Sequence, residues 1–156
     1  MRRRDPAAGR EGAPIDRGML TGLIGFHLRL AQIAVFRDFA ATTGELDITP
    51  GLFAVLVLIE SNPGLKQTEL ARAVGLDRSS IVAVIDNLER RGLVVRRPVA
   101  TDRRSNALRL TREGATLLRK VKRLVTAHEA RLAATLAPGE RVALVAMLDR
   151  IFPALR

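Results

Sequence analysis

Apolar residues recur at steps of three and four over most of the chain, and this spacing predicts amphipathic helices. Six segments show it: 16–42, 50–60, 67–74, 78–91, 112–135 and 138–152. Two short extended runs, 93–97 and 107–110, interrupt the series and predict strands. The chain is therefore expected to be mainly α-helical, with one small β-hairpin.

Residues that start and stop helices mark the ends of these segments. Thr49 and Pro50 form a helix cap followed by a first-turn proline. Gly75 can adopt the left-handed conformation that ends a helix, and Asp77 stands where the next helix needs a cap. The helices over 67–74 and 78–91 are thus joined by a tight turn, which predicts a helix-turn-helix.

A polar, turn-rich loop over 98–106 joins the two predicted strands. Two strands with a charged loop, placed directly after a helix-turn-helix, form a wing. Residues 49–111 are therefore predicted to be a winged helix-turn-helix, whose second helix can enter the major groove of DNA.

The start of that second helix carries groups suited to DNA. The first turn of a helix has unpaired backbone N–H groups and the positive end of the helix dipole, and both favour phosphate. Arg78 adds a guanidinium, while Ser79 and Ser80 are small enough to let the backbone approach closely. We expect all three residues to contact DNA.

The same helix turns Val82, Ala83 and Arg90 away from its apolar stripe. Exposed Val82 and Ala83 would fit thymine methyl groups in a major groove; alternatively, they contact another helix of the same chain. We prefer DNA contact. The expected DNA-binding set also includes Gln67 and Thr68, at the start of the preceding helix.

The predicted wing carries Asp102, Arg103 and Arg104. An arginine at a wing tip can enter a minor groove, where the negative potential is enhanced over narrow A·T-rich stretches. The nearby carboxylate of Asp102 can orient that arginine. The alternative is an ordinary solvated turn. Because this turn directly follows a helix-turn-helix, we favour DNA contact.

Charge supports a nucleic-acid partner. The 156 residues include 26 Lys and Arg against 16 Asp and Glu, a formal net charge of +10. Such a surplus favours polyanions as partners. The alternative is a basic protein from a high-GC genome, in which arginine is simply common. Residues 1–14 are a predicted basic arm, either a tail without a role or a source of further phosphate contacts.

Composition also excludes several classes of protein. With no cysteine, the chain has no disulfide, thiolate nucleophile or thiol redox sensor, and the expected location is cytoplasmic. No apolar run is long enough for a membrane span. Two histidines, no phosphate-binding glycine loop and no metal-spaced cluster argue against an enzyme, a cofactor or a metal.

Five fragments of this chain together resemble the MarR family of transcriptional regulators. They are QTELA at 67–71, LDRSSIV at 76–82, DNLERRGLV at 86–94, DRR at 102–104 and LTREG at 110–114. The resemblance covers about residues 16–152. Two positions depart from it, since Lys66 and Ala137 stand where the family has capping residues before a helix.

The resemblance implies one domain over 15–156 that forms a homodimer through interlocked helices, here 16–42 and 112–152. It implies a recognition helix in each major groove of a pseudo-palindromic operator. Arg104 matches the family's minor-groove arginine and Asp102 its salt-bridge partner. The family usually represses transcription until a small ligand binds. A non-specific architectural DNA-binding protein is the alternative.

The family's effectors are often aromatic carboxylates, phenols or acyl-coenzyme A thioesters, held where its first two helices and long fifth helix meet. A basic protein suits an acidic effector. The candidate contacts are Phe26, His27, Arg29, Leu30, Phe36, Arg37, Phe53 and His128. The alternative for the two histidines and the phenylalanines is a place in the core or dimer interface.

Overall fold

The computed structural model describes the backbone of residues 15–99 and 102–154, with side chains in these ranges except at 99, 102–106 and 152–154. The predicted arm, 1–14, lies outside the described residues. The chain forms two compact units, one ending at Val35 and the other beginning at Phe36. The elements in order are a 3₁₀ helix Gly18–Gly22, α1 Ile24–Thr43, a 3₁₀ helix Gly44–Leu46, α2 Pro50–Ser61, α3 Gln67–Val74, α4 Arg78–Arg90, β1 Val94–Val99, β2 Asp102–Leu110, α5 Arg112–Ala133 and α6 Glu140–Ala154.

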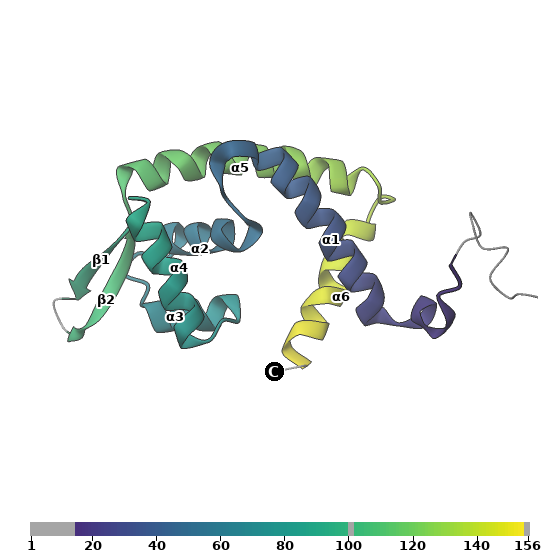
Figure 1. The fold of residues 1–156 in the computed structure, drawn as a ribbon, viewed down its shortest axis with the longest axis horizontal. Helices are drawn as coiled ribbons and strands as arrows, with labels where there is room; N and C mark the ends of the chain where they lie inside the picture. Colours follow the sequence, from purple (N-terminus) through teal and green to yellow (C-terminus); the bar gives the residue numbers. More distant parts are fainter. Residues whose placement is uncertain (1–14, 100–101, 155–156) are drawn as a thin grey trace, which may run out of the picture. The chain divides into compact units, whose positions relative to one another are not determined.

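The second unit contains a winged helix built from α2, α3, α4, the hairpin and the start of α5. Figure 1 shows α3 and α4 side by side, with the two strands next to α4. Their shared core consists of aliphatic side chains that are almost fully buried: Val55, Leu56, Ile59, Leu70, Ile81, Ile85, Leu88, Leu108, Leu118 and Val121. Removing this apolar surface from water is the main stabilisation of the unit. The prediction of a mainly helical, winged helix-turn-helix fold is confirmed.

Side-chain caps fix where the helices begin, and the cap predicted at Thr49 is present. Thr49 Oγ1 accepts the backbone N–H of Leu52 at 3.2 Å, and Pro50 opens α2. Thr111 Oγ1 accepts the N–H of Gly114 at 2.9 Å at the start of α5. Gly75 ends α3 with φ 69°, a left-handed conformation that glycine adopts without steric cost.

At each of the two positions that depart from the family's capping residues, a glutamate inside the following helix accepts the backbone N–H of that residue. Glu69 Oε2 accepts the N–H of Lys66 at 2.8 Å before α3. Glu140 Oε2 accepts the N–H of Ala137 at 2.7 Å before α6. Each bond satisfies one backbone donor that a capping hydroxyl does not reach.

The hairpin is longer than the sequence predicted. β1 and β2 pair antiparallel from Val94 with Leu110 to Pro98 with Asn106, and the register shifts between Pro98 and Val99. Asp102, Arg103 and Arg104 are therefore part of strand β2, and the prediction of a loop over 98–106 is wrong for them. The polar side chains of this segment predict a loop, but strand pairing is made by backbone hydrogen bonds, which form whatever the polarity of the side chains.

The predicted boundaries of the first and last helices differ slightly from those in the structure. The segment 16–42 is split into a 3₁₀ helix and α1, and α6 begins at Glu140, two residues after Pro138. Large apolar side chains of α6 are exposed: Val142, Leu144, Val145, Met147 and Leu148. No single helix in the described ranges is long and apolar enough to cross a bilayer, although α1 with its 3₁₀ extension and α2 pass that test as a bent pair.

Candidate nucleic-acid interface

The first turn of α4 is organised by Asp77. Its Oδ1 accepts the backbone N–H of Ser80 at 2.8 Å and the hydroxyl of Ser79 at 2.6 Å, and its Oδ2 accepts the hydroxyl of Ser80 at 2.8 Å. These hydrogen bonds, that of Ser79 foremost, hold the pKa of Asp77 far below its usual value of 3.8. The carboxylate is therefore ionised at neutral pH, at the positive end of the α4 dipole.

This arrangement decides what the first turn of α4 can offer a ligand. Arg78 and Ser79 are exposed, and with Asp77 and Val82 they line a shallow surface depression. Because both serine hydroxyl protons point to Asp77, each serine oxygen is left as an acceptor, which suits the amino groups of base edges. Arg78 supplies the positive charge that a phosphate requires.

Further along α4, the predicted outward face is accessible. Ala83 and Arg90 are exposed and Val82 is half-buried, whereas Ile81 and Ile85 on the inner face are buried. In α3, Thr68 is exposed and Gln67 is half-buried. The predicted residues of α3 and α4 thus lie on one helix-turn-helix, with at least part of each side chain open to solvent.

Arg96 on β1 joins this helix-turn-helix to the wing, and it is not among the residues predicted from the sequence. Its guanidinium contacts Asp86 Oδ1 at 2.7 Å and forms an ion pair with Glu89, while its backbone N–H donates to Glu89 Oε1 at 2.9 Å. Its Nε and Nη2 each donate to Gln67 Oε1 at 3.3 Å. The available signal was strand alternation, which places Arg96 on the same face as buried Val94.

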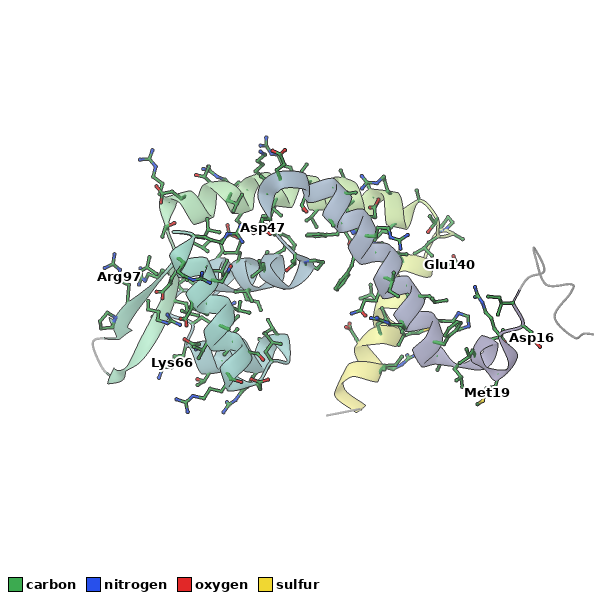
Figure 2. All side chains as sticks on the ribbon, in the orientation of Figure 1. Asp16, Met19, Asp47, Lys66, Arg97 and Glu140 are labelled. Atoms are coloured by element: carbon green, nitrogen blue, oxygen red, sulfur yellow. The ribbon has the colours of Figure 1, made fainter. Side chains whose placement is uncertain are left out.

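The wing adds positive charge beside α4. Arg97 and Arg109 are exposed, and Figure 2 shows the side chain of Arg97 projecting outward from the hairpin. The side chains of Asp102, Arg103 and Arg104 lie outside the described residues, so their expected contacts stay predictions. The described part of the wing presents cations where a nucleic-acid backbone could pass.

The candidate effector residues are divided between the two units. In the first unit, His27 Nε2 lies 2.9 Å from the carbonyl oxygen of Thr21 and Arg17 stacks over Phe26, while Arg29 and Leu30 are exposed. In the second unit, Phe53 is half-buried against Phe39, with ring centroids 6.3 Å apart. Phe36 and Arg37 are exposed there.

His128 is a predicted effector residue whose buried ring is hydrogen-bonded to a partly exposed carboxylate, that of Asp38. Its ring is 2% exposed, Nδ1 lies 2.5 Å from Asp38 Oδ2, and Phe39 packs edge-on at 5.6 Å. Arg131 Nη2 donates to the same Asp38 oxygen at 2.8 Å. The hydrogen bonds from His128 and then Arg131 lower the pKa of Asp38. This cluster ties the end of α1 to α5.

A second pocket of the same unit lies between α2, α5 and α6, with a volume of about 490 Å³. Phe53, Val125 and Ala133 give it an apolar lining, and Lys122 and Arg141 add cations. Lys122 pairs with Glu60, and Arg141 lies 4.0 Å from Glu129. Within the described residues, no cluster of histidines or carboxylates is placed to hold a metal ion.

Comparisons with known proteins agree with this geometry. The model of the MarR family matches residues 46–105. A protein of Thauera aromatica assigned as a transcriptional regulator for the hcr operon is 43% identical over 141 residues, or 90% of this chain and 85% of that protein. The transcriptional repressor CouR bound to a 23-mer DNA duplex matches with a TM-score of 0.85 and 42% identity, over 89% of this chain and 99% of that one. CouR bound to p-coumaroyl-CoA matches with a TM-score of 0.82 and 41% identity, over 88% and 97%. The chain therefore belongs to the MarR family.

Proposed function

We propose that this protein is a sequence-specific DNA-binding transcriptional repressor and not an enzyme. The observation that carries the proposal is the exposed first turn of α4, with Arg78 and Ser79 accessible beside a cationic hairpin. A helix presented in this way fits a major groove, and a basic hairpin beside it fits the flanking backbone or minor groove. A relative with 42% identity, CouR, has been solved on a DNA duplex.

The proposed repressor is a homodimer. The apolar residues exposed on α6 make a surface too apolar to be left in water, and Met19, Leu23, Ile24 and Ile33 of the first unit are exposed as well. A second copy, using the helices within 16–42 and 112–152, would cover such surfaces. Two-fold symmetry then calls for a pseudo-palindromic operator with half-sites about 10 base pairs, one helical turn, apart.

The proposed effector is an aromatic acid or its coenzyme A thioester. CouR, 41% identical, has been solved with p-coumaroyl-CoA. The pocket between α2, α5 and α6 is within the usual size range for small ligands, and Phe53 can pack against an aromatic ring. Lys122 and Arg141 would attract the carboxylate or phosphates of such a ligand.

Selection from a randomised duplex library, followed by competition binding, tests the DNA proposal. We expect enrichment of an inverted repeat whose affinity exceeds that of random duplex by about 10³-fold or more. Equal affinity for the enriched and random duplexes would instead identify a non-specific architectural protein, which the net charge of +10 also allows.

Effector binding is tested separately, on the complex with the enriched duplex. We add p-coumaroyl-CoA, benzoate or coenzyme A alone. Fluorescence anisotropy measures release of the duplex from the complex, and thermal shift measures binding to the free protein. We expect the aromatic thioester or acid to release DNA and raise the melting temperature, whereas coenzyme A alone should do neither at equal concentration. Release by coenzyme A alone would contradict an aromatic effector.

A further inference from the structure

The guanidinium of Arg96 determines which atom of Gln67 faces inward. Two of its nitrogens donate to the same amide atom of Gln67, Oε1, at 3.3 Å each. Arginine carries only hydrogen-bond donors, so the amide oxygen must be the atom turned toward it and the NH₂ group must turn away. The orientation of this amide is thus set by chemistry and not by a choice between two similar atoms.

The NH₂ group of Gln67 is available to a ligand. Among the described residues it has no hydrogen-bond partner. The nitrogen is also not buried, so it remains accessible to solvent. Gln67 is the first residue of α3, next to exposed Thr68. The donor therefore lies at the start of the helix-turn-helix, where backbone N–H groups of the first turn also point outward.

We propose that Arg96 is a positioning residue that presents Gln67 to DNA as a hydrogen-bond donor only. This inference rests on the proposed DNA-binding function. A free glutamine can recognise adenine through both amide atoms, by accepting from N6 and donating to N7. With Oε1 held by Arg96, that bidentate contact is blocked, and the remaining donor matches a phosphate oxygen.

The guanidinium of Arg96 also neutralises two carboxylates on α4 that would repel DNA. Asp86 and Glu89 lie on α4, the proposed recognition helix, and their carboxylates would repel a phosphate backbone if left unpaired. Arg96 pairs with both. Because one side chain links α3, α4 and β1, the Gln67 donor, the recognition helix and the wing are held in one fixed arrangement for the duplex.

Two isosteric substitutions at Gln67 test the donor role. The probe is the duplex enriched by the wild-type protein, and the measurement is anisotropy with a thermal melt of each variant as a check on folding. Gln67→Met removes the donor and should weaken binding about threefold to tenfold, the usual worth of one hydrogen bond. Gln67→Glu directs an acceptor at the phosphate and should weaken binding by at least tenfold more than Gln67→Met.

A double-mutant cycle tests whether Arg96 acts through Gln67. On an Arg96→Met background, the added Gln67→Met change should alter affinity less than twofold, since the amide is no longer oriented. Arg97→Met is the matched control from the same strand, because the Arg97 side chain is exposed and projects outward from the hairpin (Figure 2). On that background Gln67→Met should retain its full effect.

The outcomes separate this inference from the proposed function. If the wild-type protein enriches no duplex, the DNA-binding proposal fails. If it does, and Gln67→Glu binds that duplex as well as wild type, the donor role is wrong. Additive losses for Arg96→Met and Gln67→Met would show that Arg96 acts without Gln67. Should Arg96→Met fail to fold, the comparison of Gln67→Glu with Gln67→Met still decides the donor role.

Discussion

The carbonyl oxygen of Leu93 packs directly against Gly114, so closely that a Cβ on this glycine would stand 2.0 Å from that oxygen. Gly114 is buried in the first turn of α5, and Leu93 directly precedes β1. The same Leu93 oxygen accepts the N–H of Thr111 at 3.1 Å, and Thr111 Oγ1 donates to the carbonyl oxygen of Gly92 at 2.6 Å. The start of α5 is thereby fixed to the base of the wing.

Substitution of Gly114 by alanine should therefore destabilise the protein. The new Cβ would meet backbone atoms, which cannot swing aside as a flexible side chain can, and overpacking of this kind typically costs about 1–3 kcal/mol. Gly51→Ala is the matched control, because its nearest neighbour would be Thr49 Oγ1 at 3.9 Å. Because Gly51 is exposed in the first turn of α2, this change should alter stability by no more than about 0.5 kcal/mol. Urea unfolding measures both, and equal midpoints for the two variants would contradict the packing argument.

Acid should weaken the start of α4 through Asp77. A carboxylate whose pKa is lower in the folded than in the unfolded protein stabilises fully above its unfolded pKa, and this contribution is lost as pH falls toward the folded value. Between about pH 5 and pH 3, the melting temperature of the wild type should therefore fall more steeply than that of Asp77→Asn, whose amide does not titrate.

Ser79→Ala provides a graded version of the same test. It removes the donor that contributes most to the low pKa of Asp77, so its acid sensitivity should lie between those of the wild type and Asp77→Asn. Melting curves recorded in steps of pH give the three slopes. Parallel slopes for all three proteins would mean that these hydrogen bonds do not persist in solution.

The parts of this fold that sequence patterns predicted are held by contacts between near neighbours. Thr49, Asp77 and Thr111 each cap a backbone N–H three residues later, and the apolar stripe of α4 repeats within one helix. Because these contacts join residues only three or four positions apart, a single sequence is enough to predict them. The exposed positions of Arg78 and Ser79 follow from the same periodicity.

The parts that were missed depend on partners distant in sequence. Arg96 contacts Gln67 across 29 positions, and His128 meets Asp38 across 90. Nothing near either residue in the chain specifies those partners. The effector role expected of His128 stays a prediction, and its contact with Asp38 shows how a histidine on an apolar stripe can be satisfied within the protein.

The Asp38–His128 contact should contribute to stability. His128→Ala removes a buried ring that touches Phe39 and is expected to cost about 2 kcal/mol or more. Asp38→Ala leaves the buried imidazole without its carboxylate partner and should lower the melting temperature, whereas Arg37→Ala, at the exposed neighbour, should change stability by less than about 0.5 kcal/mol. Combining Asp38→Ala with His128→Ala should cost less than the sum of the two; strict additivity would argue against their coupling.

Salt dependence should identify the cations that contact phosphate. Each lysine or arginine that neutralises a phosphate adds about one to the slope of log affinity against log salt concentration, because DNA releases a bound counterion. Arg78→Ala is expected to lower the magnitude of this slope by about one. Arg119→Ala is the control, since this exposed arginine lies on α5, outside the helix-turn-helix and the wing. If Arg78→Ala leaves slope and affinity at the wild-type values, the first turn of α4 does not face the DNA backbone.

Arg104→Ala should make the loss of affinity depend on the sequence that flanks the operator, because the negative potential of a minor groove depends on the width of the groove. Its effect on affinity is expected to be larger on operators flanked by A·T-rich sequence, where a narrow groove concentrates negative potential, than on operators flanked by G·C pairs. Arg78→Ala, a backbone contact, should weaken binding to both duplexes by the same factor. Anisotropy titrations with the two flank types and the two variants therefore distinguish a groove contact from a phosphate contact. An equal loss for Arg104→Ala on both flanks would place that arginine on the backbone instead.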